Sequence, residues 1–361
     1  GRTKMDKRVD SNLLLDMSGM LNDIGFNLDD ELGVANMAEY HYDDGAVYGF
    51  PTKYENSRWI LINEDMFKEA GLDIPYDGWT YSEFLADAEK LTHGEDQDKV
   101  YGVCWARKQS GKSILYALDG VLGANQIYKN EEGTEVNFDN DVYRAGFNLV
   151  KETLDKGYAI PIEDEFSEDI SVANTFLQGK CAIMLGVAQM RLCMDQENYP
   201  HDFTTALVPA PVPDDEKYNT EFYRKQIGTT GAGDLLSISA NTKYPEASFE
   251  FAMWYLKGGM SPLVQGGRIP LWNGVNKDEV LSVLKEKAQG SIDMDSMENY
   301  LSLDTTQGVA AIKGHASSEI SSAWFEEFDA MCYGKQSVDQ TVQNMEKRGN
   351  ELIQTELSSQ K

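Results

Sequence analysis

The stretch RWILINEDMFKEAGLDIPYDGWTYSEF, residues 58–84, joins an apolar run to two short helical segments separated by a loop. Asn63 is a good helix N-cap, and Glu64 and Asp65 add negative charge to the first turn, where the helix dipole favours it. Gly71 suits the left-handed residue that ends a helix. The stretch therefore predicts a buried strand followed directly by a short helix.

The second helical segment begins with a recognisable cap. Thr80 and Glu83 have the T-x-x-E spacing of a capping box, in which each side chain bonds the backbone of the other residue. Apolar residues then recur at helical spacing. They are Phe84, Leu85, Ala88 and Leu91. A second helix to about Thr92 is predicted.

The composition limits the classes of partner. The chain has 361 residues, of which 60 are acidic and 32 basic, so its formal net charge is -28. Such a charge opposes binding to nucleic acids and to anionic membranes, and it is typical of a solubilising acidic surface. A chain of this length has room for two domains with ample cores. We expect a globular protein that does not bind nucleic acid.

Patterns for metals and cofactors are missing from the sequence. The four cysteines are widely spaced and match no zinc or C-x-x-C motif. Because they lie in segments assigned to separate elements, four free thiols are expected. The acidic runs 29–32 and 163–169 do not match the twelve-residue calcium loop. GTTGAG, residues 228–233, lacks the strand and helix that flank a nucleotide-binding glycine motif. We predict neither a metal nor a cofactor.

Strand-like and helical segments alternate along the chain. Helices are expected over 113–123 and 140–156, after Ser167, and from Pro245, which suits the first helical residue. The region 268–275 looks irregular, and the chain after it mainly helical. The strand-like runs are 47–51, 58–62, 100–105, 181–187, 203–211 and 235–239. This interleaving indicates an α/β fold.

Several segments, taken in order, resemble a known family. VYGFP, an apolar strand ending in Asn63, MFKEAGL and a Trp-Thr turn are similar to the central signature of ABC transporter extracellular solute-binding proteins of family 1, the carbohydrate-binding type. FLQGKCAIMLGV, GTTGAGDLLSIS, EASFEFAMWYL and GKQSVDQTVQNMEKRGNEL follow in the family's order. The resemblance covers the chain from about residue 10. It implies a two-lobe, periplasmic-binding-protein-like fold of type II.

The resemblance also assigns the lobes. The first lobe would comprise residues 1–52 and 233–295, and the second lobe residues 53–230 and 296–361. The chain would cross between them near 50–56, 228–234 and 296. Family members normally begin with three βα units before the segment that here reads LLLDMSGMLNDIGF. Those units are missing, so we expect an incomplete first lobe, with any export signal upstream or already removed.

The function implied by the resemblance is transport. The protein would be the extracellular substrate-binding component of an ABC importer, holding a sugar or oligosaccharide in the interlobe cleft by hinge closure. Its partners would be the permease and ATPase subunits. It would act as a monomer outside the cell, as a surface lipoprotein or in the periplasm.

Sugars present hydroxyl edges and apolar faces, so a sugar site needs aromatic platforms and planar polar side chains. The resemblance places such residues after the first hinge strand, after the 100–105 strand and in the loop after the 181–187 strand. Where the family has an aromatic residue in G-x-W, this chain has Gly186, Val187 and Ala188. The predicted ligand-binding residues are Glu55, Asn56, Arg58, Trp59, Trp105, Arg107, Gln189 and Arg191, with Asp234, Trp272, Glu319 and Trp324 as further candidates.

Other interpretations of these residues and of the function remain open at this point. Trp59 and Trp105 flank apolar strands and fit a core as well as a cleft, whereas Trp79 and Trp254 are assigned to packing. The rival functions are a carbohydrate-active hydrolase, which needs two carboxylates across a cleft, and a non-transport carbohydrate-binding or adhesion module. The four histidines are dispersed, and H-E-x-x-H and G-x-S-x-G are missing. We expect a binding protein that is not an enzyme.

Overall fold

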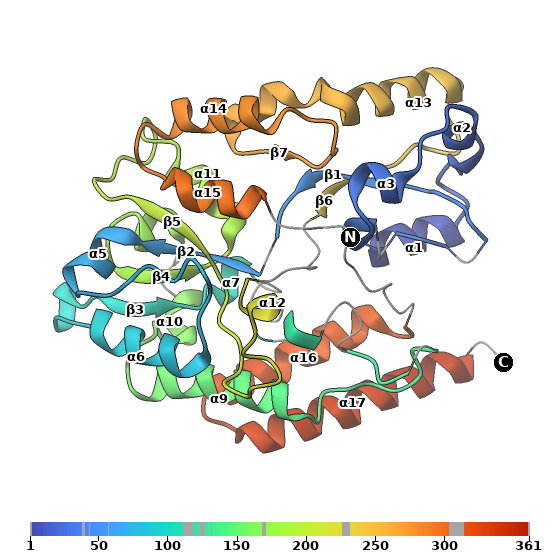
Figure 1. Cartoon of the computed structure of the whole chain (residues 1–361). Coiled ribbons are helices and arrows are strands. Elements are labelled where there is room, and N and C mark those ends of the chain that lie inside the picture. The colour runs from blue at the N-terminus through green and yellow to red at the C-terminus, as the bar shows by residue number, and fades with distance from the viewer. Residues whose placement is uncertain are drawn as a thin grey trace. The chain divides into compact units, whose positions relative to one another are not determined.

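Strands and helices interleave between residues 50 and 270 in the computed structural model, and helices precede and follow this region (Figure 1), as expected for an α/β fold. The structure describes residues 2–37, 40–42, 44–56, 58–110, 118, 120–122, 127–130, 132–167, 171–225, 232–302 and 314–359. No helix in these ranges is both long enough and apolar enough to span a membrane.

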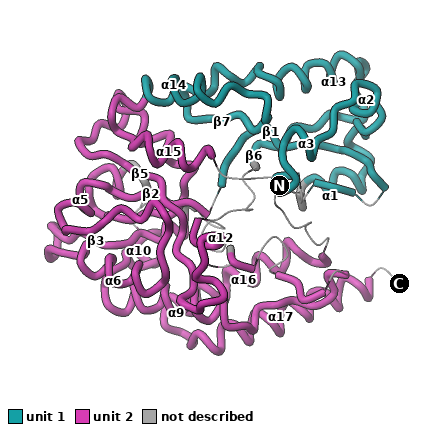
Figure 2. Tube along the Cα trace, viewed as in Figure 1, with its two compact units in different colours: residues 1–56, 228–287, 303–311 teal, residues 57–227, 288–302, 312–361 magenta. Residues whose placement is uncertain are grey.

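The chain divides into two units (Figure 2). Unit 1 comprises residues 1–56, 228–287 and 303–311, and unit 2 comprises residues 57–227, 288–302 and 312–361. The range 233–295 expected for the first lobe extends past residue 287, where the second range of unit 1 ends. Residues 288–302 belong with unit 2 because Thr205 pairs with Ile292, and the Leu207 N–H donates to Ser296 Oγ at 3.0 Å. The lobe ranges themselves stay a prediction.

Unit 1 contains, among its described residues, a three-stranded sheet in the order β6-β1-β7. Strand β1 (Phe50–Tyr54) runs antiparallel to both β6 (Ala232–Leu236) and β7 (Ile269–Pro270). The core of the unit gathers Phe50, Ile238 and apolar residues of the flanking helices. Those helices are α1 (Arg2–Asp10), α2 (Ser18–Asp23), α3 (Leu28–Leu32), α4 (Val34–Met37) and α13 (Pro245–Trp254), with a π-helical turn over Tyr255–Gly259. A 3-10 turn over Ser261–Gly266 and helix α14 (Lys277–Ala288) follow in the chain.

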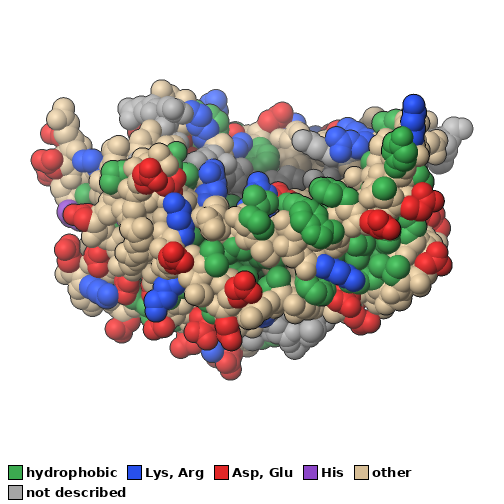
Figure 3. All heavy atoms as spheres, turned by 90° about the horizontal axis from the view of Figure 1, so that it is seen from above, with side chains coloured by type: hydrophobic (Ala, Val, Ile, Leu, Met, Phe, Trp, Pro, Cys, Tyr) green, Lys and Arg blue, Asp and Glu red, His purple; other side chains and the backbone are tan. Residues whose placement is uncertain are grey.

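Helix α13 begins at Pro245, as predicted, but it corrects one packing assignment. Phe249, Ala252 and Met253 form its buried stripe, whereas Trp254 is 60% exposed. At about 100° per residue, position 254 lies away from that stripe, so the expectation that Trp254 packs inside was wrong. Figure 3 shows hydrophobic side chains among charged ones on the face that carries this helix.

Unit 2 is built on a four-stranded sheet, counting described residues, in the order β3-β4-β2-β5. Strands β3 (Tyr101–Cys104) and β4 (Cys181–Leu185) pair in parallel, and β2 (Trp59–Asn63) pairs antiparallel with β4 and with β5 (Thr205–Pro209). Every residue of β2, β4 and β5 is buried. Both faces of this sheet are therefore covered, as the apolar runs predict.

Helices surround this sheet. The longest, α17 (Val338–Ser359), packs against α16 (Ser317–Cys332) and α9 (Asp141–Asp155). The other helices among the described residues are α5 (Glu64–Glu69), α6 (Tyr81–Leu91), α7 (Arg107–Ser110), α10 (Ile162–Ser167), α11 (Met190–Cys193), α12 (Glu221–Arg224) and α15 (Met294–Leu301), with short turns over Asp96–Asp98, Gly120–Leu122, Val172–Phe176 and Val187–Gln189.

The junction that opens the sequence analysis is confirmed in detail. The Asn63 side chain accepts the N–H of Met66 at 3.0 Å, and Gly71 has φ 67°. Thr80 and Glu83 form both bonds of the capping box. Trp79 is buried, and its indole N–H donates to the Pro209 carbonyl at 2.9 Å. The loop between the two helices is thus anchored to the end of β5.

Several predicted boundaries differ. The strand expected over 47–51 begins at Phe50, the strand expected over 235–239 is β6, and the region expected to be irregular contains β7. Ser167 ends α10 instead of capping a helix, and a π-helical turn precedes β4. The helix expected over 113–123 lies mostly outside the described residues.

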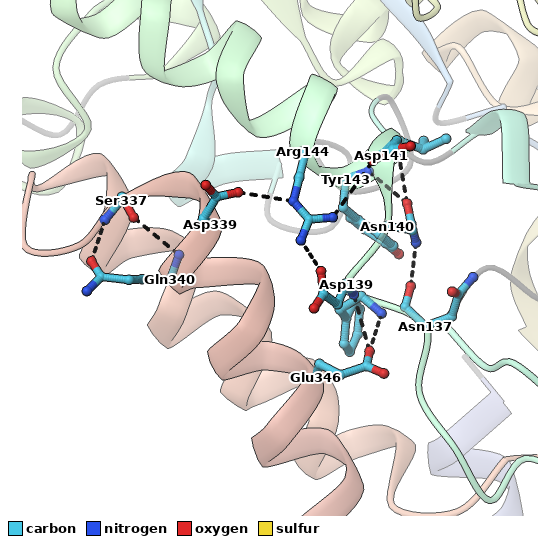
Figure 4. A network of polar contacts seen from close by, with 12 residues as sticks. Asn137, Asp139, Asn140, Asp141, Tyr143, Arg144, Ser337, Asp339, Gln340 and Glu346 are labelled. Carbon is cyan, nitrogen blue, oxygen red and sulfur yellow. Dashed lines mark hydrogen bonds and ion pairs between the residues drawn. The ribbon is translucent and has the colours of Figure 1, made fainter.

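A polar network fastens α17 to the segment before α9 (Figure 4). Arg144 forms ion pairs with Asp139 and Asp339, the latter at 3.0 Å. Glu346 of α17 accepts the backbone N–H of Phe138 at 2.7 Å, and Asn140 caps α9. The bonds of Asp339 and Glu346 join residues about two hundred positions apart in the chain, so the C-terminal helix is an integral part of unit 2.

Candidate functional site

The predicted site residues of unit 1 lie at the end of β1 and on the strands beside it. Glu55 follows β1 and pairs with Lys53. Asn56 is completely buried. Burial raises the pKa of Tyr54 above its usual range, while a hydrogen bond with the Asn56 side chain acts in the opposite direction. Asn56 is thus tied to the strand that it follows.

Asp234 lies on β6 in a left-handed conformation, with φ 52°. Its carbonyl accepts a hydrogen bond from Thr52 Oγ1 at 2.8 Å, and its carboxylate forms an ion pair with Arg268. Aspartate adopts this conformation more readily than bulky residues do, but it still costs free energy, and such residues concentrate at functional sites. The left-handed conformation is consistent with a functional role for Asp234.

Trp272 follows β7 and is partly buried. Its indole Nε1 donates to Glu31 Oε2 at 2.7 Å, which ties the ring to α3. A Cβ placed on Gly274 would meet the Trp272 ring at 2.2 Å, so only glycine fits there. The indole is therefore held in one position on unit 1.

Two predicted residues at the start of β2 lie inside unit 2. Trp59 is buried and meets the Tyr300 ring edge-on, with the ring centroids 5.3 Å apart. Arg58 is also buried, and its carbonyl accepts the Ala210 N–H at 2.7 Å. The structure thus places Trp59 among core residues rather than on an open surface.

Trp105 and Arg107 follow β3 and differ in environment. Trp105 is buried, donates from its indole N–H to Thr153 Oγ1 at 2.9 Å, and contacts Phe84. Arg107 donates from Nε and Nη2 to the two carboxylate oxygens of Asp329, at 2.7 and 2.8 Å, and its guanidinium lies 4.1 Å from the Phe325 ring centroid. The bidentate pair fixes the direction of the guanidinium.

A buried carboxylate that the sequence did not single out supports this segment. Glu165 of α10 is 1% exposed, and its Oε2 accepts the Lys108 N–H at 3.2 Å. Burial raises the pKa of Glu165 to about 7, while hydrogen bonds from the backbone N–H groups of residues 106–108 act in the opposite direction. The sequence does not indicate this burial, because Glu165 lies within the acidic run 163–169, where its neighbour Glu163 is exposed.

The remaining candidates of unit 2 lie on the loop after β4 and on α16. Arg191 donates to Gln189 Oε1 at 3.3 Å, and Ala188, at the position where the resemblance places an aromatic residue, is partly buried. Glu319 is exposed in the first turn of α16. Trp324 is buried and stacks on Phe328 with the ring planes 10° apart. It too occupies the core.

The structure therefore pairs some predicted residues with cations and buries others. In unit 1, Glu55 pairs with Lys53 and Asp234 pairs with Arg268, two cations that the sequence did not suggest. In unit 2, three candidate indoles are interior. Within the described ranges, no group of three or more His, Cys, Asp or Glu side chains is arranged to hold a metal ion.

Comparison with known proteins identifies the fold. The chain is similar to an ABC substrate-binding protein from Listeria monocytogenes in complex with cycloalternan (16% identity, TM-score 0.69, covering 97% of this chain and 82% of that one). It is also similar to the sugar-binding protein MalE from Xanthomonas citri (15% identity, TM-score 0.67, covering 99% of this chain and 84% of that one). A third similar structure is UgpB from Mycobacterium tuberculosis in complex with glycerophosphocholine (16% identity, TM-score 0.69, covering 99% of this chain and 82% of that one). The fold is a two-domain, periplasmic-binding-protein-like fold.

The family follows from the sequence match. The model of the family described as bacterial extracellular solute-binding protein matches residues 2–257, which is well over half of the chain. That range includes the capped junction, β4 and helix α13, on which the resemblance in the sequence depends. The chain belongs to the family of bacterial extracellular solute-binding proteins.

Proposed function

We propose that this protein is the substrate-binding component of an ABC importer and that it binds a neutral sugar or oligosaccharide. The family match over residues 2–257 carries the proposal. The sugar class is supported by similar structures, one described as a sugar-binding protein and another in complex with cycloalternan. The permease and ATPase of the importer are the partners, and the protein acts outside the cell, as a monomer, in the periplasm or as a surface lipoprotein.

The proposed mechanism is hinge closure over the ligand. The chain passes from unit 1 to unit 2 after Asn56 and returns after Ile227. Each unit carries polar candidate residues, Glu55 and Asp234 on one and Arg107 on the other. A ligand that contacts both units favours the closed state by the free energy of the contacts made only there. The proposal involves no chemical step, in contrast to a carbohydrate-active hydrolase.

The burial of three candidate tryptophans changes which aromatic platform is proposed. Trp59, Trp105 and Trp324 are occupied by core contacts. Trp272 is only partly buried, and its indole is already held by Glu31. We therefore place the sugar-stacking role on Trp272, because a fixed ring loses little conformational entropy when a sugar face packs on it.

Thermal unfolding against a panel of maltose, maltotriose, raffinose and D-mannitol tests the proposal. A ligand that binds only the native state raises the melting temperature as its concentration rises above Kd. Small-angle scattering with the best ligand should show a smaller radius of gyration than without it. A panel without any thermal shift, or release of shorter sugars during incubation, would contradict the proposal.

A further inference from the structure

The segment of unit 2 that leads back to unit 1 forms no strand. Strand β5 ends at Pro209, and the chain leaves unit 2 after Ile227. We call residues 213–225 the return segment. Its helix, α12, has only four residues. Since no sheet holds the return segment, its position on unit 2 depends on loop and side-chain contacts.

The end of the return segment is fastened by the junction loop, residues 70–80 between α5 and α6, and by the first turn of α6. Arg224 Nη2 donates to the Gly78 carbonyl at 2.7 Å and lies 3.1 Å from Glu83 Oε2. Lys225 Nζ pairs with Asp77 Oδ1 at 3.0 Å. The bond to Gly78 matters most, because ion pairs of exposed side chains add little stability.

A close backbone contact accompanies these bonds. A Cβ added to Gly78 would come within 2.2 Å of the Arg224 carbonyl oxygen and 2.6 Å of its carbonyl carbon. Gly78 also has φ 78°, in the left-handed region that favours glycine. Two separate requirements thus call for glycine at position 78. The steric requirement exists because the backbone of the return segment lies directly against the junction loop.

Apolar contacts hold the middle of the return segment. Tyr218 and Tyr223 are partly buried against a small cluster of three valines, Val121, Val142 and Val212. Phe222 between them is 41% exposed. The residues nearest the crossing, Arg224 and Lys225, are instead held by polar contacts with residues 77–83. These polar contacts therefore decide where the attachment to unit 2 ends.

The junction loop also contacts a second segment next to a crossing. The chain enters unit 2 again after Lys287, and Asp293 then caps α15 by accepting the Asp295 N–H at 2.9 Å. The Tyr76 hydroxyl donates to the Asp293 carboxylate. One loop thus bonds two segments that connect the units, although neither segment is near it in the sequence.

We propose that the junction loop is a hinge anchor, in which Gly78 and Arg224 are positioning residues that fix the point from which the chain crosses back to unit 1. Hinge motion occurs in the residues between the parts that stay fixed. While Arg224 is held, the connection that changes during closure starts no earlier than Lys225. If Arg224 is released, the connection starts earlier in the chain and is longer.

A longer connection weakens ligand binding without any loss of a ligand contact. It adds arrangements of the two units in which a ligand cannot contact both of them, so the binding-competent fraction falls. The apparent affinity falls by the same factor. This inference rests on the proposed function and assigns a role in closure to residues that need not touch the ligand.

Two glycines of the junction loop provide a matched pair of variants. Gly71 and Gly78 have φ 67° and 78°, so alanine strains the backbone at either position. A Cβ on Gly71, however, would meet no atom within 4 Å, whereas a Cβ on Gly78 displaces Arg224. In isothermal titration with the panel sugar that wild type binds most tightly, Gly78→Ala should lose about threefold to tenfold in affinity. Gly71→Ala should melt lower and bind like wild type.

Arg224→Ala tests the same contact from the other side and adds no backbone strain. It should weaken binding in the same direction as Gly78→Ala, and it replaces that variant if Gly78→Ala does not fold, which circular dichroism checks. Wild-type affinity in folded Gly78→Ala and Arg224→Ala overturns the hinge anchor and leaves the proposed function standing. Equal losses in Gly78→Ala and Gly71→Ala assign the effect to lower stability and also overturn it.

Small-angle scattering without sugar tests the hinge anchor independently of ligand binding. Ligand-free Gly78→Ala and Arg224→Ala should have a larger radius of gyration than wild type and Gly71→Ala, because a longer connection allows more extended arrangements. If wild type binds no panel sugar, the proposed function fails and the scattering alone decides. Equal radii in all four proteins would then refute the hinge anchor.

Discussion

Replacing Glu165 with glutamine should make the stability of the protein less dependent on pH. The Glu165 carboxylate is buried beneath residues 106–108, and its pKa is raised to about 7 from an ordinary 4.5, mainly by desolvation. The folded state therefore holds the Glu165 proton more tightly than the unfolded chain does. The contribution of this group to stability is fully present below pH 4.5 and is lost as pH rises through about 7.

The size of the effect follows from the two pKa values. Each unit of pKa corresponds to about 1.36 kcal/mol. The interval from 4.5 to about 7 therefore allows a loss of about 3 kcal/mol in wild type between pH 4.5 and pH 8. Glutamine cannot ionise, so the variant escapes this loss. Hydrogen bonds that glutamine makes or breaks shift its stability equally at all pH values and do not alter the comparison.

Urea unfolding of both proteins from pH 4.5 to pH 8 measures the difference. The free energy of unfolding of Glu165→Gln, minus that of wild type, should increase with pH by up to about 3 kcal/mol, most of it between pH 5 and 7. Glu163→Gln, at an exposed position of the same helix, controls for removing one negative charge from a chain of net charge -28. A difference that stays constant with pH, or that Glu163→Gln reproduces, refutes the reasoning.

Three further results are expected. Trp105→Ala should lower the free energy of unfolding by about 3–5 kcal/mol in urea, because it empties a core position; a loss below about 1 kcal/mol would place the indole outside the core. Thr80→Ala should cost about 1 kcal/mol through loss of the capping box, whereas Thr355→Ala, late in α17, serves as a control away from any cap. Alkylation of the denatured, non-reduced protein should add four labels by mass, since Cys104, Cys181, Cys193 and Cys332 are free thiols; two labels would reveal a disulfide.

Signals that act within a few residues were sufficient to predict part of the fold. Asn63 bonds an N–H three residues away, and Thr80 and Glu83 satisfy one another, so neither feature depends on the rest of the chain. The apolar run of β2 was also readable, because a strand covered on both faces must be apolar throughout. Strand limits in unit 1 were less accurate, since pairing with β6 extends β1 through the polar residue Lys53 to Tyr54.

The candidate site was harder to predict because its residues pair and pack through contacts between distant segments. Arg268 and Asp234 are paired across β1, a relation that only the strand order creates. Trp59 and Trp105 flank apolar strands, which fits both a core and a cleft, and only the packing of Tyr300 and Thr153 distinguishes the two. Glu165 resembles its acidic neighbours in sequence and differs from them only in burial.

Because Trp254 is exposed, the tryptophan fluorescence of this protein should report on the unfolding of its two units separately. Four of the six tryptophans, Trp59, Trp79, Trp105 and Trp324, are buried in unit 2, and the other two belong to unit 1. Acrylamide should therefore quench mainly Trp254 in the native protein. The red shift of emission on denaturation should come mainly from unit 2. If the two signals change at different urea concentrations, the units unfold separately, and one free energy of unfolding will not describe the chain.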